Sequence, residues 1–288
     1  MTTTIIKIVG RLVLLAGFFA LVITGLYGQS TQPGITFATG GIDLKIDSRA
    51  FYNGLWYPSS SWKLKELIPG SDYFFDFDDV KPGDWGKTVI SMHVKKGDAW
   101  LCLDFKNLES EENGENEPEY EEDIDGPNSG ELDEGMEFFA WHDDGDNKYE
   151  KGEKAIFNPI VQSADQVLDD ETYPIGDTQN GKSCKANESR YVGIHWCAGN
   201  LSVNTYTAQI SCDGSVLGNE AQTDILSVDV SIRALPSKEN PRFICKDKKP
   251  HYGGGGGGGH NDDDDDRYKK KNYKKFVSWF SHSYSGWW

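Results

Sequence analysis

The chain has few positive charges and lacks the short motifs of common metal and redox sites. Lysine and arginine number 29 against 46 acidic residues, so the formal net charge is -17. Such an acidic surface argues against nucleic acid as a partner and favours solubility and cation binding. No C-x-x-C pair occurs, which argues against a zinc ribbon or a thioredoxin-like motif. No H-E-x-x-H occurs and the six histidines do not cluster in sequence, so no catalytic zinc is indicated.

A long apolar run occurs at the N-terminus. Leu12–Tyr27 spans 16 uncharged residues, with two basic residues shortly before it and the small residues Gly28 and Ser30 after it. A membrane-spanning helix needs about 20 residues, so this run is at the short edge for one. The pattern predicts an export signal over residues 1–30, removed by a signal peptidase. Retention of the segment as an N-terminal anchor is the alternative.

The middle of the chain, residues 31–245, indicates a β-rich domain. Alternation of apolar and polar residues predicts strands at Ile42–Ile46 and, most clearly, at Thr223–Leu235. In the second strand the apolar residues are expected to face inward and Ser227, Asp229, Ser231 and Arg233 outward. A turn at 95–98 is expected to join strands 87–94 and 99–108 into a hairpin. Other strands are expected at 136–141, 155–160, 190–197 and 206–212, with irregular structure at 49–79 and 161–189.

Two segments have low complexity. Glu109–Glu134 is acidic and has few apolar residues, so a mobile loop is expected there. Residues 246–288 combine a glycine tract, an aspartate run, a basic cluster and an aromatic end. Glycine tracts behave as flexible linkers, so the segment is expected to be a disordered tail. Docking of the aromatic end on a partner or on the cell envelope, helped by the lysines, is the alternative.

A candidate metal loop follows the predicted strand 136–141. Five acidic residues fall within the eleven residues 143–153, and hard cations such as calcium take six to eight oxygen ligands, often from one short loop. In EF-hand register, position 12 is Glu153 and position 6 is Asn147, which tolerates a left-handed turn. The remaining ligand positions 3, 5, 7 and 9 are Asp144, Asp146, the carbonyl of Lys148, and Glu150.

Position 1 of this register is the weak point of the loop. It holds His142, a poor calcium ligand, for which the neighbouring Asp143 is the substitute. Because the first ligand is displaced, a solvated acidic turn without a metal is the alternative interpretation. His93, on the strand 87–94, is expected to be a structural or exposed residue and not a ligand.

Five cysteines are spread along the chain, at positions 102, 184, 197, 212 and 245. In an exported protein they allow two disulfides and one remaining thiol. Cys197 and Cys212 are close enough in sequence to close a short hairpin. Sequence spacing does not determine the connectivity of the others.

The order of several segments resembles that of a known family. After the export signal come FATGGIDLKIDS, VKPGDWGKTVISMHV and AWLCLDF, and later FFAWHDDGDNKYEKGE, GIHWCAGN, ISCDGS, NEAQTDILSVDVSIRA and NPRFIC. This order is similar to that in the TasA, CalY and camelysin group and in its cysteine-containing relatives. The resemblance covers residues 8–245 and leaves out the C-terminal tail.

The resemblance implies an antiparallel β jelly roll, secreted after cleavage and polymerised into extracellular biofilm fibres. The implied assembly is donor-strand exchange, in which the freed N-terminal segment Gln29–Gly40 adds to the sheet of the next subunit. Ile35 and Phe37 lie two apart in this segment and would point to the same face of an added strand. They are therefore the expected anchors of the donor strand.

Two other functions are weighed against a matrix fibre subunit. One is a monomeric, calcium-binding cell-surface adhesin that holds its ligand on loops and attaches through its tail. The other is a metallo-endopeptidase, an activity described for camelysin. The latter would require His93, His142 and His195 to converge through folding, since a catalytic zinc usually has three protein ligands.

Overall fold

The computed structural model describes residues 41–68, 71–77, 79–113, 119, 121 and 130–245, together with the backbone of 276–281. Strands dominate these residues, and all but one of the pairings between strands are antiparallel. The export signal and the donor segment with Ile35 and Phe37 lie outside the described residues. The predicted all-β antiparallel fold is confirmed, while the jelly-roll connectivity stays a prediction.

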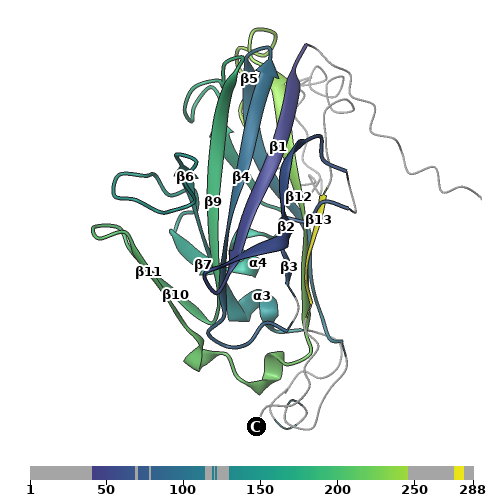
Figure 1. Cartoon of the computed structure of the whole chain (residues 1–288), viewed down its shortest axis with the longest axis vertical. Coiled ribbons are helices and arrows are strands. Elements are labelled where there is room, and N and C mark those ends of the chain that lie inside the picture. The colour runs from purple at the N-terminus through teal and green to yellow at the C-terminus, as the bar shows by residue number, and fades with distance from the viewer. Residues whose placement is uncertain are drawn as a thin grey trace, which may run out of the picture. The chain divides into compact units, whose positions relative to one another are not determined.

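The strands form two large sheets and a separate hairpin (Figure 1). Sheet A has the strand order β2 (Leu55–Lys65), β1 (Asp43–Tyr52), β4 (Trp85–Lys96), β9 (Glu188–Ala198), β6 (Met136–Asp143) and β7 (Val161–Ser163). Sheet B has the order β3 (Asp76–Phe77), β13 (Phe276–Ser281), β12 (Ile225–Pro236), β5 (Ala99–Glu111) and β8 (Thr172–Gly176). The hairpin consists of β10 (Asn200–Asn204) and β11 (Gln209–Asp213).

Among the described residues, four short helical turns lie in the connections. They are α3 (Leu132–Gly135), α4 (Ala164–Val167) and the 3-10 turns Gly214–Val216 and Asn219–Ala221. Leu132 and Val167 each bury an apolar side chain in the main core. These turns therefore help to close the ends of the two sheets.

The main hydrophobic core lies between the two large sheets. Ile90 and Met92 of β4 and Trp196 of β9 reach it from sheet A, and Leu103 of β5 and Val228 of β12 reach it from sheet B, all at most 1% exposed. A second, smaller core covers the other face of β6. It contains Phe139, Trp141, Tyr149, Cys197 and Leu201.

The alternation of side chains in a strand explains the two cores. Phe138 and Ala140 of β6 point into the main core, while Phe139 and Trp141 point into the second one. The strand is thus buried on both faces. This explains the unbroken apolar run Phe138–Trp141, after which the acidic loop begins.

The predicted hairpin around 95–98 is not formed. Both strands exist, but β4 belongs to sheet A and β5 to sheet B. Gly97, with a φ of 74°, lies in the short connection that crosses between the sheets, and Ala99 exchanges two 2.8 Å backbone hydrogen bonds with Cys184 instead. Alternation and turn residues identify the two strands, but they do not tell to which sheet each strand belongs.

Residues 49–79 are more regular than expected. The strand predicted at Ile42 continues to Tyr52, and β2 pairs with it from Leu55 onward. The turn between them is Asn53-Gly54, with φ angles of 47° and 80°. Asn-Gly is the preferred pair for a two-residue hairpin turn of this conformation, so the signal for β2 was present in the sequence.

The prediction of a strand at 155–160 is wrong. Only an isolated bridge joins Ala155 to Trp141, and β7 begins at Val161. Pro159 has no amide hydrogen to donate and interrupts pairing there. Conversely, residues 161–189, which were expected to be irregular, include β7, α4 and β8.

Three further expectations are corrected. The acidic segment 109–134 is shorter than predicted, because β5 continues to Glu111 and α3 begins at Leu132. The tail, predicted to be disordered, supplies β13, and its aromatic and β-branched residues have high strand propensity. The polar residues of β12 that were predicted to face outward are buried, because strand β5 supplies hydrogen-bond partners for them. Asp104 accepts hydrogen bonds from Arg233 Nε at 2.8 Å and Nη2 at 2.6 Å.

Candidate functional site

The predicted metal loop begins where β6 ends, at Asp143. This side chain is 8% exposed, and its Oδ2 accepts a 3.0 Å hydrogen bond from Trp141 Nε1. Its Oδ1 accepts backbone hydrogen bonds from Gly145 at 2.6 Å and from Asn147 at 3.3 Å. The substitute for the missing first ligand is therefore a fixed, buried carboxylate that organises the turn.

The predicted ligands do not all lie together. Asp143, Asp144 and Asp146 each offer one carboxylate oxygen, and these oxygens lie within 4.8 Å of one another. Glu153 does not join this group. Its two oxygens accept backbone hydrogen bonds from Asp144 at 3.1 Å and from Glu150 at 2.7 Å, which closes the loop.

Two basic residues from neighbouring strands hold the loop against sheet A. Arg49 of β1 donates to the carbonyl of Gly145 at 2.9 Å, and Lys87 of β4 donates to the carbonyl of Asn147 at 2.8 Å. Burial lowers the pKa of Lys87, and Asp146 opposes that effect. Neither residue carried a local sequence signal, because both lie more than fifty residues from the loop.

Asn147 adopts the left-handed conformation that its place in the loop predicted, with a φ of 65°. It is 1% exposed. Its Nδ2 donates to the carbonyl of Arg49 at 3.1 Å. Its Oδ1 is buried and has no hydrogen-bond partner among the described residues. Amide oxygens and carboxylate oxygens are both ligands that a hard cation accepts, so these donor groups are of the kind that calcium takes.

Ionisation of the surrounding side chains follows from burial. The pKa of Glu153 is raised, first by burial and then by Asp143 and Asp144 among other groups. The pKa of His142 is lowered, first by burial and then by Lys154 and Arg190. His142 is therefore held in its neutral form over a wider pH range than a free histidine.

The three histidines considered as zinc ligands lie at different levels of sheet A. His195 of β9 is level with Lys87, His142 of β6 is level with Val192, and His93 of β4 is level with Ser189. His93 binds neighbouring side chains, Asp47 at 2.8 Å and Ser189 at 2.7 Å. Within the described ranges, no metal-ligating cluster contains a histidine.

The second feature that bears on function is the strand position between β12 and β3 in sheet B. Strands β12 and β3 are not paired with each other, and β13 lies between them (Figure 1). It pairs antiparallel with β12 from Ile225 to Val230 and parallel with Asp76 and Phe77 of β3. Sheet B is therefore completed by a strand from the distant C-terminal segment.

One edge of sheet A exposes apolar side chains. Strand β2 forms this edge and exposes Leu55 at 76%, Trp56 at 60% and Leu64 at 42%. Exposed apolar edge strands are sites at which another chain can associate. Pro58 in the same strand limits continuous backbone pairing there.

The cysteines pair as far as the sequence predicted. Cys197 forms a disulfide with Cys212 across 15 residues, and Cys102 forms one with Cys245 across 143 residues. Cys184 is the remaining thiol and is buried. Two disulfides are compatible with an extracellular location. No helix among the described residues is both long and apolar enough to cross a membrane.

The comparisons with known proteins give no relative. No protein-family model, curated protein or solved structure matches the chain.

Proposed function

We propose that this protein is a secreted structural subunit of an extracellular matrix fibre and that it assembles by strand addition. The observation that carries the proposal is the position between β12 and β3, which is completed by a strand from outside the core of the domain. An added strand gains affinity from backbone hydrogen bonds on both sides. A strand from another subunit can make the same bonds.

The length of the connecting segment supports exchange at this position. Thirty residues, 246–275, separate Cys245 from β13, and seven of them form an uninterrupted glycine tract. A connection of this length adds little to the cost of releasing a strand, because loop entropy changes slowly with length. The strand β13 thus acts as an internal occupant that an incoming strand replaces.

The incoming strand is the N-terminal segment Gln29–Gly40 freed by removal of the export signal. The motif order that resembles the TasA, CalY and camelysin group supports this assignment, because donor-strand assembly is what that resemblance implies. Pro33 lacks an amide donor and marks the start of pairing. Ile35 and Phe37 then share one face of the donor. Repetition of this head-to-tail contact produces a filament.

The test is replacement of both anchors by aspartate in the secreted chain. Ile35→Asp with Phe37→Asp should abolish filaments in negative-stain micrographs, because two charges would be buried without partners. The monomer should keep its circular dichroism spectrum. The matched control is Thr36→Asp with Ala38→Asp, which adds the same charge to the opposite face. Normal filaments from the anchor variant would overturn assembly through this segment.

A monomeric, calcium-binding cell-surface adhesin is the second candidate. It is favoured by the three clustered aspartates of the loop and by the fact that β13 of the same chain already completes sheet B. An adhesin of this kind would sediment as a monomer at every calcium concentration. Calcium-dependent or calcium-independent filaments would both exclude it.

A further inference from the structure

A pair of carboxylates faces each other at the end of the ladder between β5 and β12. The final pair in this ladder is Glu111 with Ile225, so Glu112 and Asp224 are opposite each other one step further. Asp224 is fully buried and Glu112 is partly buried. Like charges directly opposite on neighbouring strands are destabilising. This arrangement therefore needs a proton or a cation between the two groups.

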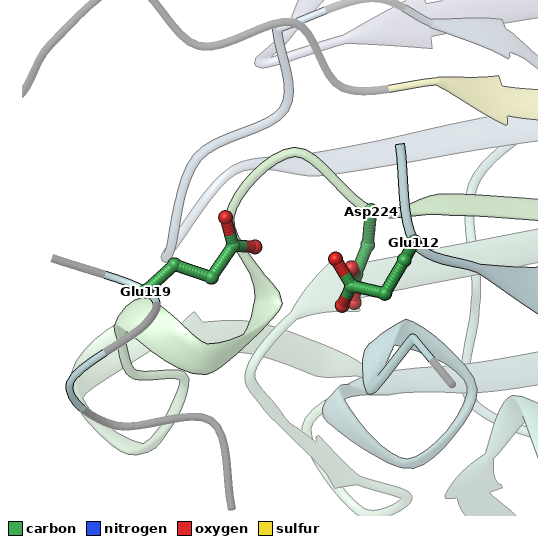
Figure 2. Close-up of side chains that lie close together, drawn as sticks. All are labelled: Glu112, Glu119 and Asp224. Atoms are coloured by element: carbon green, nitrogen blue, oxygen red, sulfur yellow. The ribbon is translucent and has the colours of Figure 1, made fainter. Parts of the chain in front are cut away.

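A third carboxylate joins the pair from the connection between β5 and α3. Glu119 is fully buried, and its two oxygens lie 3.3 and 3.1 Å from the hydroxyl of Thr223, which donates to them. One oxygen each of Glu112, Glu119 and Asp224 lies within 4.8 Å of the others. Figure 2 shows the three side chains, with those of Glu112 and Asp224 approaching each other.

The Asp224 carboxylate is only half satisfied. Its Oδ2 accepts a 2.6 Å hydrogen bond from the backbone of Glu131, whereas its Oδ1 is buried and has no hydrogen-bond partner within the part of the chain that the structure describes. Gly130 lets the chain pass this closely, because a Cβ there would lie 3.0 Å from Asp224 Cγ. A buried carboxylate oxygen without a donor is costly, and a cation would satisfy it.

We propose that Glu112, Glu119 and Asp224 bind one calcium ion, which ties the acidic connection between β5 and α3 to the ends of β5 and β12. The three groups offer only oxygen ligands, as calcium prefers, and neither histidine nor cysteine takes part in the cluster. The site is separate from the loop at 143–153 and does not depend on fibre assembly.

Calcium and a proton are alternative occupants of the space between these carboxylates. Burial, and after it the Glu112 carboxyl, raise the pKa of Asp224 to about 9. Because carboxylates bind a metal in their deprotonated form, a calcium ion that enters displaces any proton held there into solvent.

The experiment is calcium titration of the secreted chain by calorimetry. Asp144→Asn with Asp146→Asn provides the background, because it removes two carboxylates from the other loop. In that background we expect one calcium ion per chain. Adding Asp224→Asn or Glu119→Gln should weaken binding at least tenfold. Adding Glu134→Gln is the matched control, since it removes an exposed carboxylate nearby, and it should change nothing.

The outcomes separate a cation from a shared proton. If the background protein binds no calcium, the pair holds a proton only and the proposal is overturned. The same conclusion follows if Glu119→Gln and Glu134→Gln bind calcium equally. Should Asp224→Asn fail to fold, Glu119→Gln decides alone, because Glu119 lies outside both strands and its amide keeps the size of the side chain.

Discussion

His195 is a buried base without a full set of partners. Its ring is 7% exposed and stacks on Trp85 with 5.2 Å between the ring centroids. Its Nδ1 has no hydrogen-bond partner among the residues that the structure places. Burial lowers the pKa of His195 to about 4, and the Lys87 ammonium acts in the same direction. The folded protein therefore holds His195 neutral where an unfolded chain would protonate it.

The free energy of unfolding should consequently fall as the pH falls from about 6.5 to about 4. In this window the unfolded state binds the proton and the folded state does not, so acid favours unfolding. At pH 5 the loss should be about 2 kcal/mol, because pH 5 lies about 1.5 units below the pKa of an ordinary histidine and each unit corresponds to about 1.4 kcal/mol. Urea unfolding of wild-type and His195→Gln protein at pH 5 and pH 8 measures this loss of unfolding free energy. An unchanged pH slope in the variant would assign the effect to another group, such as His142.

Cys184 should be the single thiol of the protein and should react slowly. It is 1% exposed, and burial raises its pKa, so little reactive thiolate is present. Titration with a chromogenic disulfide should find about one thiol after unfolding without reductant, as an odd number of cysteines requires, and almost none in the folded protein. Cys184→Ser should abolish the signal in both states. Five thiols in the unfolded chain would contradict the disulfides.

At the scale of elements, strand β13 offers the sharpest test. A chain that ends at Cys245 lacks this strand and leaves β12 and β3 without their shared neighbour. Unpaired strand edges recruit other chains, so the truncated protein should form filaments or aggregates faster than the full chain. Deletion of 282–288 alone is the control, because it keeps β13. A peptide of residues 274–283 should slow association of the truncated chain, and a truncated chain that stays monomeric would show that the position needs no strand.

The positions of strands in the sequence were predicted better than the pairing of these strands in sheets. The apolar alternation of β9 and β12 reports which side chains are buried, and both strands were expected nearly at their observed bounds. Sheet membership was not predictable, because β4 and β5 look the same whether they pair or cross between sheets. The polar face of β12 was expected to be exposed to solvent, because the alternation within one strand does not tell which other strand supplies partners for its polar side chains. Its burial depends on Asp104, far away in sequence.

The candidate sites were predictable to different degrees. The loop at 143–153 is local, so its acidic spacing and the left-handed Asn147 were visible in the sequence. The residues that hold it, Arg49 and Lys87, arrive from other strands and gave no local signal. Glu112 and Asp224 are separated by more than a hundred residues, and only the register of β5 against β12 brings them together.

At the scale of the whole molecule, the excess of acidic residues, which gives the full sequence a net charge of -17, opposes self-association. Each subunit that joins a filament brings the same charge close to the last one, and the repulsion extends over the Debye length. That length is about 30 Å at 0.01 M salt and about 8 Å at 0.15 M. Filament formation should therefore be slow at low ionic strength and accelerate as sodium chloride is added.

Divalent ions separate general screening from specific binding. At equal ionic strength, calcium should accelerate filament formation more than magnesium. Magnesium dehydrates reluctantly and demands near-octahedral geometry, whereas calcium accepts irregular sets of carboxylates such as those at Asp144 and at Asp224. Light scattering of the secreted chain in sodium, magnesium and calcium chloride gives the three rates. Equal rates in the two divalent salts would reduce the role of calcium to screening, because ions that remain in solution act only through their charge and concentration.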